Sequence, residues 1–313
     1  MTSHFRFPEW NHETRSYGES DEVIVNEVKP GNRSCIEIFE RDYGALCGIL
    51  SRRMQQHVPR STILERRVQQ GHMNQRYVLP EVIKGYGGEI PSQRVFDKRR
   101  RVAMKSADSS AIGLLLDQSG STRFLVSENY SRIDLIKDAT FMLGRAIRQF
   151  NDSFFVFSYH SSEDVNPTFA EGLKFEHEPW SSQVEERIAS IDHTAGTYNY
   201  NNKDGAAIRF ANERLLNTSC EHMHLFLLTD GAPNCDDTYY EDRFAYEDTR
   251  QALAEGKAQG INNIYLTINP EYDAQEFISH VFEETVLCKR YTNLSDIYED
   301  MVDIYEMIRE ERI

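Results

Sequence analysis

The sequence predicts an α/β fold: a Rossmann-like, doubly wound and mostly parallel sheet, with a small, mainly helical N-terminal region. The first observation is that short, continuously apolar runs alternate with longer segments of helical periodicity from residue 110 onward. That alternation is typical of a parallel sheet covered by helices on both faces. The second observation is that residues 1–105 lack this alternation of apolar runs and helical segments. We therefore expect an N-terminal region at 1–105 and an α/β domain at 106–313.

The N-terminal region is predicted to hold one clear helix. Residues 1–35 are polar and suggest irregular structure, whereas residues 36–58 carry apolar side chains at every third or fourth position, which indicates an amphipathic helix. Residues 59–92 contain further helical fragments and end in a stretch that reads as a linker because of Gly85, Gly87, Gly88 and Pro91.

The α/β domain begins with a strand that has no polar face, Ala111 to Leu116, so it is expected to be buried on both sides. Further strands are predicted at 154–157, 224–229, 264–268 and, shorter, 286–291. Helices are predicted at 131–149, 181–191, 205–216, 243–259, 273–283 and 295–311. Gly260 is suited to end the helix that precedes it.

Composition and charge limit the classes of function. The chain of 313 residues is 40% apolar and 27% charged, which is ordinary globular usage. Its formal net charge of −15 disfavours nucleic acid and anionic lipid as partners and suits a basic protein or a divalent cation. Five cysteines without a CxxC pair favour a reducing compartment over a disulfide framework or a zinc site. With no apolar signal core and no span-length apolar run, we expect a cytoplasmic protein without membrane insertion.

One basic run interrupts this acidic chain, at Lys98, Arg99, Arg100 and Arg101. A charge run is usually a solvated face. The alternative is a docking patch for an acidic partner.

Chemistry-bearing side chains follow the predicted strands. Asp117, Ser119 and Ser121 come directly after the first strand, and Asp230 follows the third. Because ligands bind at the carboxyl ends of strands in such sheets, these side chains are expected to meet. They form an all-oxygen set that suits Mg²⁺ or Mn²⁺, with waters completing an octahedron. Burying two carboxylates without a cation would cost several kcal/mol.

Other interpretations of these residues are less well supported. Asp and Ser could simply cap the following helices. Ser119 or Ser121 could act as a nucleophile, but no GxSxG elbow is present. An Asp117 phosphotransferase would need a second aspartate where Ser119 stands. We therefore expect a binding protein and not an enzyme.

The two loops resemble a known family. Asp117-Gln118-Ser119-Gly120-Ser121 is similar to the first loop of the metal-ion-dependent adhesion site of von Willebrand factor A domains, and LLTDGAPN, which contains Asp230, resembles that family's later aspartate loop. The resemblance implies that Asp117, Ser119 and Ser121 hold the metal and that Asp230 holds it directly or through water. The family's middle-loop threonine has no clear counterpart. Counting back from the helix start at Gly205 places it at Asn202, with Thr194, Thr197 and Asp204 as alternatives.

The resemblance narrows to an intracellular bacterial branch. NNKDGAAIRFANERLL and LFLLTDGAPNCDD look like the nitric-oxide-reductase activation proteins of NorD type, the related rubisco activation subunit (CbbO type) and the cobaltochelatase large subunit (CobT type). Phe7-Pro8-Glu9-Trp10-Asn11 also resembles a PEWD-like segment that precedes the A domain in the activation proteins.

The resemblance to this branch implies that the protein is an adaptor. Its members work with a hexameric MoxR-type AAA+ ATPase, and the metal captures an acidic side chain of a client protein that the ATPase then remodels. This chain has no GxxxxGK[ST] motif, so ATP hydrolysis is expected from the partner. A chelatase subunit is the alternative, although residues 1–105 lack the long acidic stretch expected of it.

Overall fold

The structure is a computed structural model of the 313-residue chain. It describes residues 2–31, 33–56, 60–70, 72–73, 75–86, 92, 94–103, 110–148, 153–161, 167–192, 201–231, 233, 240, 242–268 and 274–309.

The chain forms two compact units, and their bounds differ from the predicted division at residue 105. The main unit combines Met1–Gln55 with Asp108–Ile313, and the second unit is Gln56–Ala107. The N-terminal residues therefore belong to the α/β unit, because their strands pair with its sheet.

Within the described residues, eight strands form the main sheet in the order β1-β2-β10-β9-β6-β11-β12-β13. Strands β9, β6, β11, β12 and β13 run parallel, whereas β10 is antiparallel to β9. The bounds are β1 Ser3–Asn11, β2 Ser16–Glu27, β6 Ser110–Asp117, β9 Ser153–Ser161, β10 Thr168–Lys174, β11 His222–Thr229, β12 Ile261–Ile268 and β13 Leu287–Tyr291. The predicted strands are all present, and β10 was not predicted.

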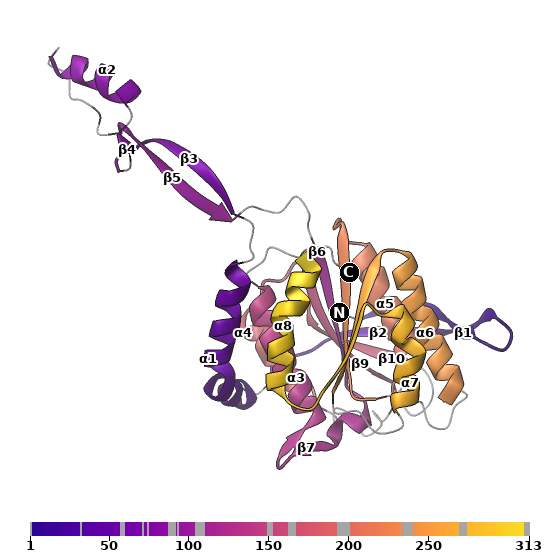
Figure 1. Ribbon diagram of the computed structural model, residues 1–313. Coiled ribbons are helices and arrows are strands. Elements are labelled where there is room, and N and C mark those ends of the chain that lie inside the picture. Colours follow the sequence, from indigo (N-terminus) through magenta and orange to yellow (C-terminus); the bar gives the residue numbers. More distant parts are fainter. Residues whose placement is uncertain are drawn as a thin grey trace. The chain divides into compact units, whose positions relative to one another are not determined.

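Helices cover both faces of this sheet (Figure 1). One layer contains α1 (Ser34–Gln56), α3 (Arg132–Ile147), α4 (Ser182–Ser190) and α8 (Leu294–Arg309), and the other contains α5 (Asp204–Leu216), α6 (Asp242–Ala258) and α7 (Ala274–Val281). Gly260 has a φ of +85°, a conformation that favours glycine, and it follows α6 as predicted. The predicted α/β, Rossmann-like fold, a mostly parallel sheet covered by helices on both faces, is confirmed.

Short elements complete the main unit. The 3-10 helix η1 (Gly120–Arg123) directly follows β6, and the hairpin of β7 (Leu125–Ser127) and β8 (Tyr130–Ser131) leads into α3. A second 3-10 helix, η2 (Phe282–Glu284), follows α7.

The N-terminal segment departs from prediction. Residues 1–35 were expected to be irregular and the N-terminal region mainly helical, and both expectations are wrong. Strands β1 and β2 pair antiparallel, and β2 continues the sheet parallel to β10. The reason lies in alternation: Asp21, Val23 and Val25 of β2 face the interior, while the intervening residues leave the segment polar on average. The predicted helix at 36–58 is confirmed as α1.

The second unit contains a small sheet, and of the helical fragments predicted within 59–92 the structure has one among the residues it describes, α2 (Gln75–Tyr86). Strands β3 (Arg60–Val68), β5 (Phe96–Ala103) and β4 (His72–Met73) form a three-stranded sheet. Its sequence holds eleven Lys and Arg against four Asp and Glu, a formal charge of +7, which leaves −22 for the rest of the chain. The basic run falls on β5, and the side chains of Arg99 to Arg101 lie outside what the structure describes.

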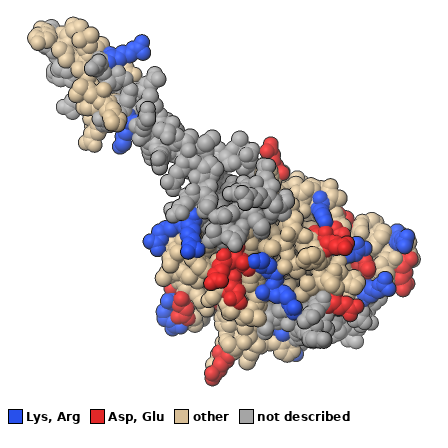
Figure 2. Space-filling view, viewed as in Figure 1, with Lys and Arg blue, Asp and Glu red and all other residues tan. Residues whose placement is uncertain are grey.

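On the face of the main unit seen in Figure 2, acidic and basic side chains are interspersed and do not form one large patch. None of the described helices combines the length and the apolar character needed to cross a membrane.

Candidate metal centre

The carboxyl ends of β6 and β11 bring the two predicted aspartate loops together. The strands are parallel neighbours, with Leu116 opposite Leu228. Asp117 ends β6 and Asp230 follows β11, and both carboxylates are buried, at 0% and 1% exposure. Parallel pairing explains this meeting of two residues that are far apart in sequence.

The two serines link these carboxylates. The backbone N–H of Ser119 donates to Asp117 Oδ1 over 2.8 Å. The Ser119 and Ser121 hydroxyl oxygens lie 2.9 Å apart, and Ser121 Oγ donates to Asp230 Oδ1 over 2.9 Å. Thr229, which sequence reasoning did not select, donates its hydroxyl to Asp117 Oδ2 over 2.8 Å.

The middle loop reaches the same place from α5. An isolated bridge between Ser161, at the end of β9, and Asn201 fixes this loop at the sheet edge. The Asn202 amide nitrogen then donates to Asp117 Oδ2 over 3.4 Å and to Asp204 Oδ1 over 3.1 Å. Thr194 and Thr197, the other candidates for this position, lie outside the described residues.

Asp204 is the third buried carboxylate of the site, at 0% exposure. Tyr159 donates to its Oδ1 over 2.8 Å and Tyr265 to its Oδ2 over 3.3 Å. The sequence placed Asp204 only among the alternatives, because counting back from the helix start at Gly205 pointed to Asn202. The sequence feature that could have identified Asp204 is its position directly before Gly205, the predicted start of the helix.

Burial dominates the electrostatics. Burial, followed by repulsion from Asp204, raises the pKa of Asp117 to about 6. Burial also raises the pKa of Asp204 to about 7, although the hydroxyls of Tyr159 and Tyr265 oppose the shift. The pKa of Asp230 is raised to about 7 by burial and by the charge of Asp117. These shifts mean that the ionised form of each group is disfavoured unless a cation is near.

Arg132 supplies one such cation. It is the first residue of α3, and its Nη1 lies 2.8 Å from Asp230 Oδ2. Both side chains are buried, and the guanidinium also lies over the ring of Phe124, 5.2 Å from its centroid. One guanidinium against three carboxylates leaves the site with excess negative charge when all three are ionised.

The donor set fits Mg²⁺. An octahedral ion with Mg–O distances of about 2.1 Å separates neighbouring ligand oxygens by about 3.0 Å. The two serine hydroxyl oxygens lie 2.9 Å apart, as do Ser121 Oγ and Asp230 Oδ1, which is close to that separation and is also an ordinary hydrogen-bond length. No set of three His, Cys, Asp or Glu side chains in the described part of the chain is placed to hold a metal by itself.

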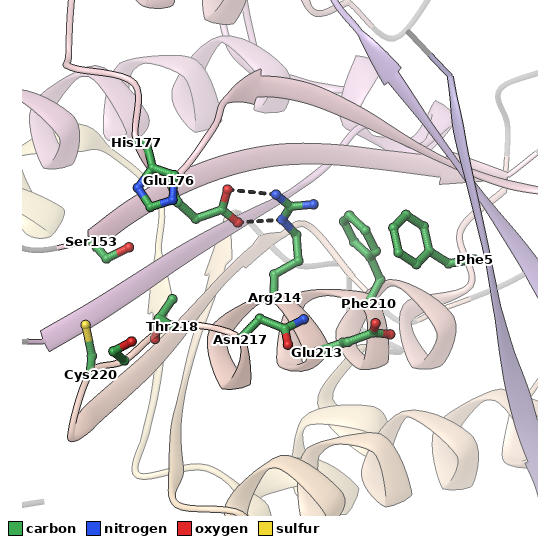
Figure 3. Close-up of a pocket in the computed structure, with 11 residues that line it drawn as sticks. Phe5, Ser153, Glu176, His177, Phe210, Glu213, Arg214, Asn217, Thr218 and Cys220 are labelled. Carbon is green, nitrogen blue, oxygen red and sulfur yellow. Dashed lines mark hydrogen bonds and ion pairs between the residues drawn. The ribbon is translucent and has the colours of Figure 1, made fainter.

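A separate cavity of about 740 Å³ lies at the opposite edge of the sheet, where β9 and β11 begin (Figure 3). Phe5 and Phe210 line it beside Arg214, whose guanidinium is held by Glu176 through two hydrogen bonds of 2.6 and 2.7 Å. The charges of Arg214 and Glu176 therefore offset each other, and none of the residues that line the cavity belongs to the aspartate loops.

Comparisons with known proteins agree with this description of the main unit. No family model matches the chain. It is 32% identical over 169 residues to Protein NorD of Stutzerimonas stutzeri, which covers 54% of this chain and 26% of that protein. With Protein NorD of Brucella suis it shares 33% identity over 178 residues, 57% of this chain and 27% of the relative.

A solved structure shares the fold. The D319A mutant of the PilB minor pilin from Streptococcus sanguinis superposes with a TM-score of 0.51 at 14% identity, over 70% of this chain and 66% of that chain. The match to the curated relatives spans about a quarter of their length. The chain is thus similar to NorD proteins over roughly half of its own length.

Proposed function

We propose that this protein is a metal-dependent, non-enzymatic adaptor that binds an acidic side chain of a partner protein through Mg²⁺, with Mn²⁺ as a possible substitute. The observation that carries the proposal is that Ser119 and Ser121 link the buried carboxylates of Asp117 and Asp230 where β6 and β11 end. Asn202 contacts both Asp117 and Asp204 there. Raised pKa values at all three carboxyls support a site that needs a cation.

Each residue has a distinct part in this proposal. Ser119, Ser121 and Asp117 would hold the ion from the β6 loop, and Asp230 would hold it directly or through water. Asp204 and Asn202 would act from the middle loop, with Asn202 turning its carbonyl oxygen toward the ion. Mg²⁺ held by these residues would supply a Lewis acid to which a carboxylate of a partner protein could bind.

The partners are inferred from the similarity to NorD proteins. We infer that the protein works in the cytoplasm with a MoxR-type AAA+ ATPase to activate or remodel a client protein or metalloenzyme. The +7 charge of the second unit makes it a candidate contact for an acidic partner, in line with the docking interpretation of the basic run.

The test is titration of Mg²⁺ into chelator-treated protein by isothermal calorimetry. We expect one saturable site in the wild type and none in Asp117→Ala. A wild-type protein that binds no Mg²⁺, and whose melting temperature Mg²⁺ does not change, would rule out the metal-dependent mechanism.

A further inference from the structure

The N-terminal strand β1 ends beside the loop that carries Asn202 and Asp204, although it lies about 190 residues earlier in the chain. Between those two site residues stands Lys203, whose side chain is completely buried. Its Nζ lies 3.0 Å from Oε1 of Glu9 in β1 and 3.8 Å from Oδ1 of Asp21 in β2. Burying an ammonium group is costly unless it is paired, so this loop conformation depends on the two N-terminal carboxylates.

A second set of contacts holds the same loop from its other end. The backbone N–H of Trp10, next to Glu9, donates to Asp248 Oδ1 over 2.7 Å. Asp248 Oδ2 accepts the hydroxyl of Tyr240 over 2.9 Å, and that hydroxyl oxygen accepts the N–H of Gly205 over 3.2 Å. A Cβ on Gly205 would lie 1.9 Å from Asp248 Oδ2, so the first turn of α5, which follows the loop, approaches Asp248 as closely as only glycine allows.

These two sets of contacts converge on one loop. Lys203 also lies over the ring of Tyr240, with Nζ 5.4 Å from the ring centroid. Glu9 is only 3% exposed, so it is not placed to meet solvent or a partner directly. Within the Phe7–Asn11 segment, the role of Glu9 is therefore to pair with the buried Lys203.

We propose that β1 positions the middle loop of the metal centre, with Glu9 acting through Lys203 and Trp10 acting through Asp248 and Tyr240. The N-terminal strand then contributes to the metal site, because it determines the positions of Asn202 and Asp204 relative to Asp117. This inference rests on the proposed Mg²⁺ function.

The experiment compares Glu9→Gln with Glu22→Gln in the full chain. Glu22 is a matched control because it is a carboxylate on the paired strand β2 that contacts His4 on the surface. Mg²⁺ affinity is measured by calorimetry, Mn²⁺ coordination by electron paramagnetic resonance, and metal-free stability by thermal unfolding. We expect Glu9→Gln to weaken Mg²⁺ binding about tenfold, as expected for a residue that orients a ligand, and to change the Mn²⁺ spectrum. Glu22→Gln should change neither.

The outcomes separate this inference from the proposed function. If the wild type binds Mg²⁺ and Glu9→Gln binds it equally well, with an unchanged Mn²⁺ spectrum, the positioning role is refuted and the metal site stands, even if the melting temperature has fallen. If the wild type binds no Mg²⁺, both the proposed function and this inference are refuted. Should Glu9→Gln fail to fold, Tyr240→Phe tests the second contact path: weakened Mg²⁺ binding supports the proposal, and unchanged binding overturns it.

Discussion

Arg132 and Asp230 form a buried ion pair, 2.8 Å between Nη1 and Oδ2, at the edge of the proposed metal site. The capping box of Ser131 and Asp134 starts α3 at this point and so fixes where the arginine begins. Asp230 thus has two neighbours of different kinds: a guanidinium on one oxygen and the Ser121 hydroxyl on the other. The guanidinium supplies part of the positive charge that the metal would supply.

The first prediction concerns competition between the Arg132 guanidinium and Mg²⁺ for the Asp230 carboxylate. Replacing Arg132 with methionine removes a fixed cation beside the site, so Mg²⁺ affinity should rise. The metal-free protein should unfold at a lower temperature, since breaking a buried pair costs about 3–5 kcal/mol. Calorimetry and thermal unfolding measure both. Arg123→Met is the control, because Arg123 lies over the same Phe124 ring at 5.5 Å. A lower Mg²⁺ affinity in Arg132→Met would instead make Arg132 a residue that orients Asp230 for the metal.

Asp117→Ala should abolish Mg²⁺ binding and the metal-dependent capture of the client protein while the fold persists. The variant loses the acceptor of Ser119 N–H and of the Thr229 hydroxyl, but it also removes a carboxylate that repels Asp204. We therefore expect circular dichroism like that of the wild type. Retention of Mg²⁺-dependent partner binding in a pull-down with this variant would contradict the metal bridge.

Asn202→Ala and Asp204→Asn distinguish the two middle-loop candidates. Asn202 faces Asp117 through its amide nitrogen at 3.4 Å, whereas Asp204 contributes a buried charge. We expect a mild loss of Mg²⁺ affinity in Asn202→Ala and a larger loss in Asp204→Asn. Calorimetric Mg²⁺ titration of both variants measures these losses. A loss of Mg²⁺ affinity in Asn202→Ala equal to that in Asp117→Ala would identify Asn202 as a primary ligand.

The effect of Mg²⁺ on stability should grow with pH. The folded-state pKa values of Asp117, Asp204 and Asp230 are raised to about 6, 7 and 7, so the folded metal-free chain holds protons that the unfolded chain has released. Their contribution to stability is therefore present at low pH and is lost as pH rises from about 4 to about 7. Mg²⁺ offsets that loss, so the Mg²⁺-induced rise in melting temperature should be larger at about pH 8 than at about pH 5.5.

A matched control exists for that measurement. Burial raises the pKa of Asp138 to about 7 as well, and Asp138 accepts the hydroxyl of Tyr130 on the α3 side of the sheet. Asp138→Asn should leave the pH dependence of the Mg²⁺ effect unchanged. A Mg²⁺ effect that is independent of pH in the wild type would show that the site carboxyls do not exchange protons for the ion.

Local pattern was sufficient for the helices and the parallel strands of the α/β domain. The run that became β6 is apolar on both faces, and the loops after β6 and β11 carry Asp117 and Asp230 where parallel strands end. The same patterning missed β1 and β2, because a strand with one polar face resembles an irregular segment when no partner strand is known. It also missed β10, whose pairing with β9 and β2 is settled by the sheet and not by its own sequence.

The sequence by itself determined the fold class and brought Asp117, Ser119, Ser121 and Asp230 to one edge, because these follow from hydrophobic periodicity and from parallel strand geometry. Only the tertiary structure decided the rest of the site. Asp204 became a third buried carboxylate, Arg132 took a place against Asp230, and Glu9 paired with Lys203 across 194 residues. Charges that are buried must find partners in space, and no short-range pattern in a chain specifies which distant residue will be there.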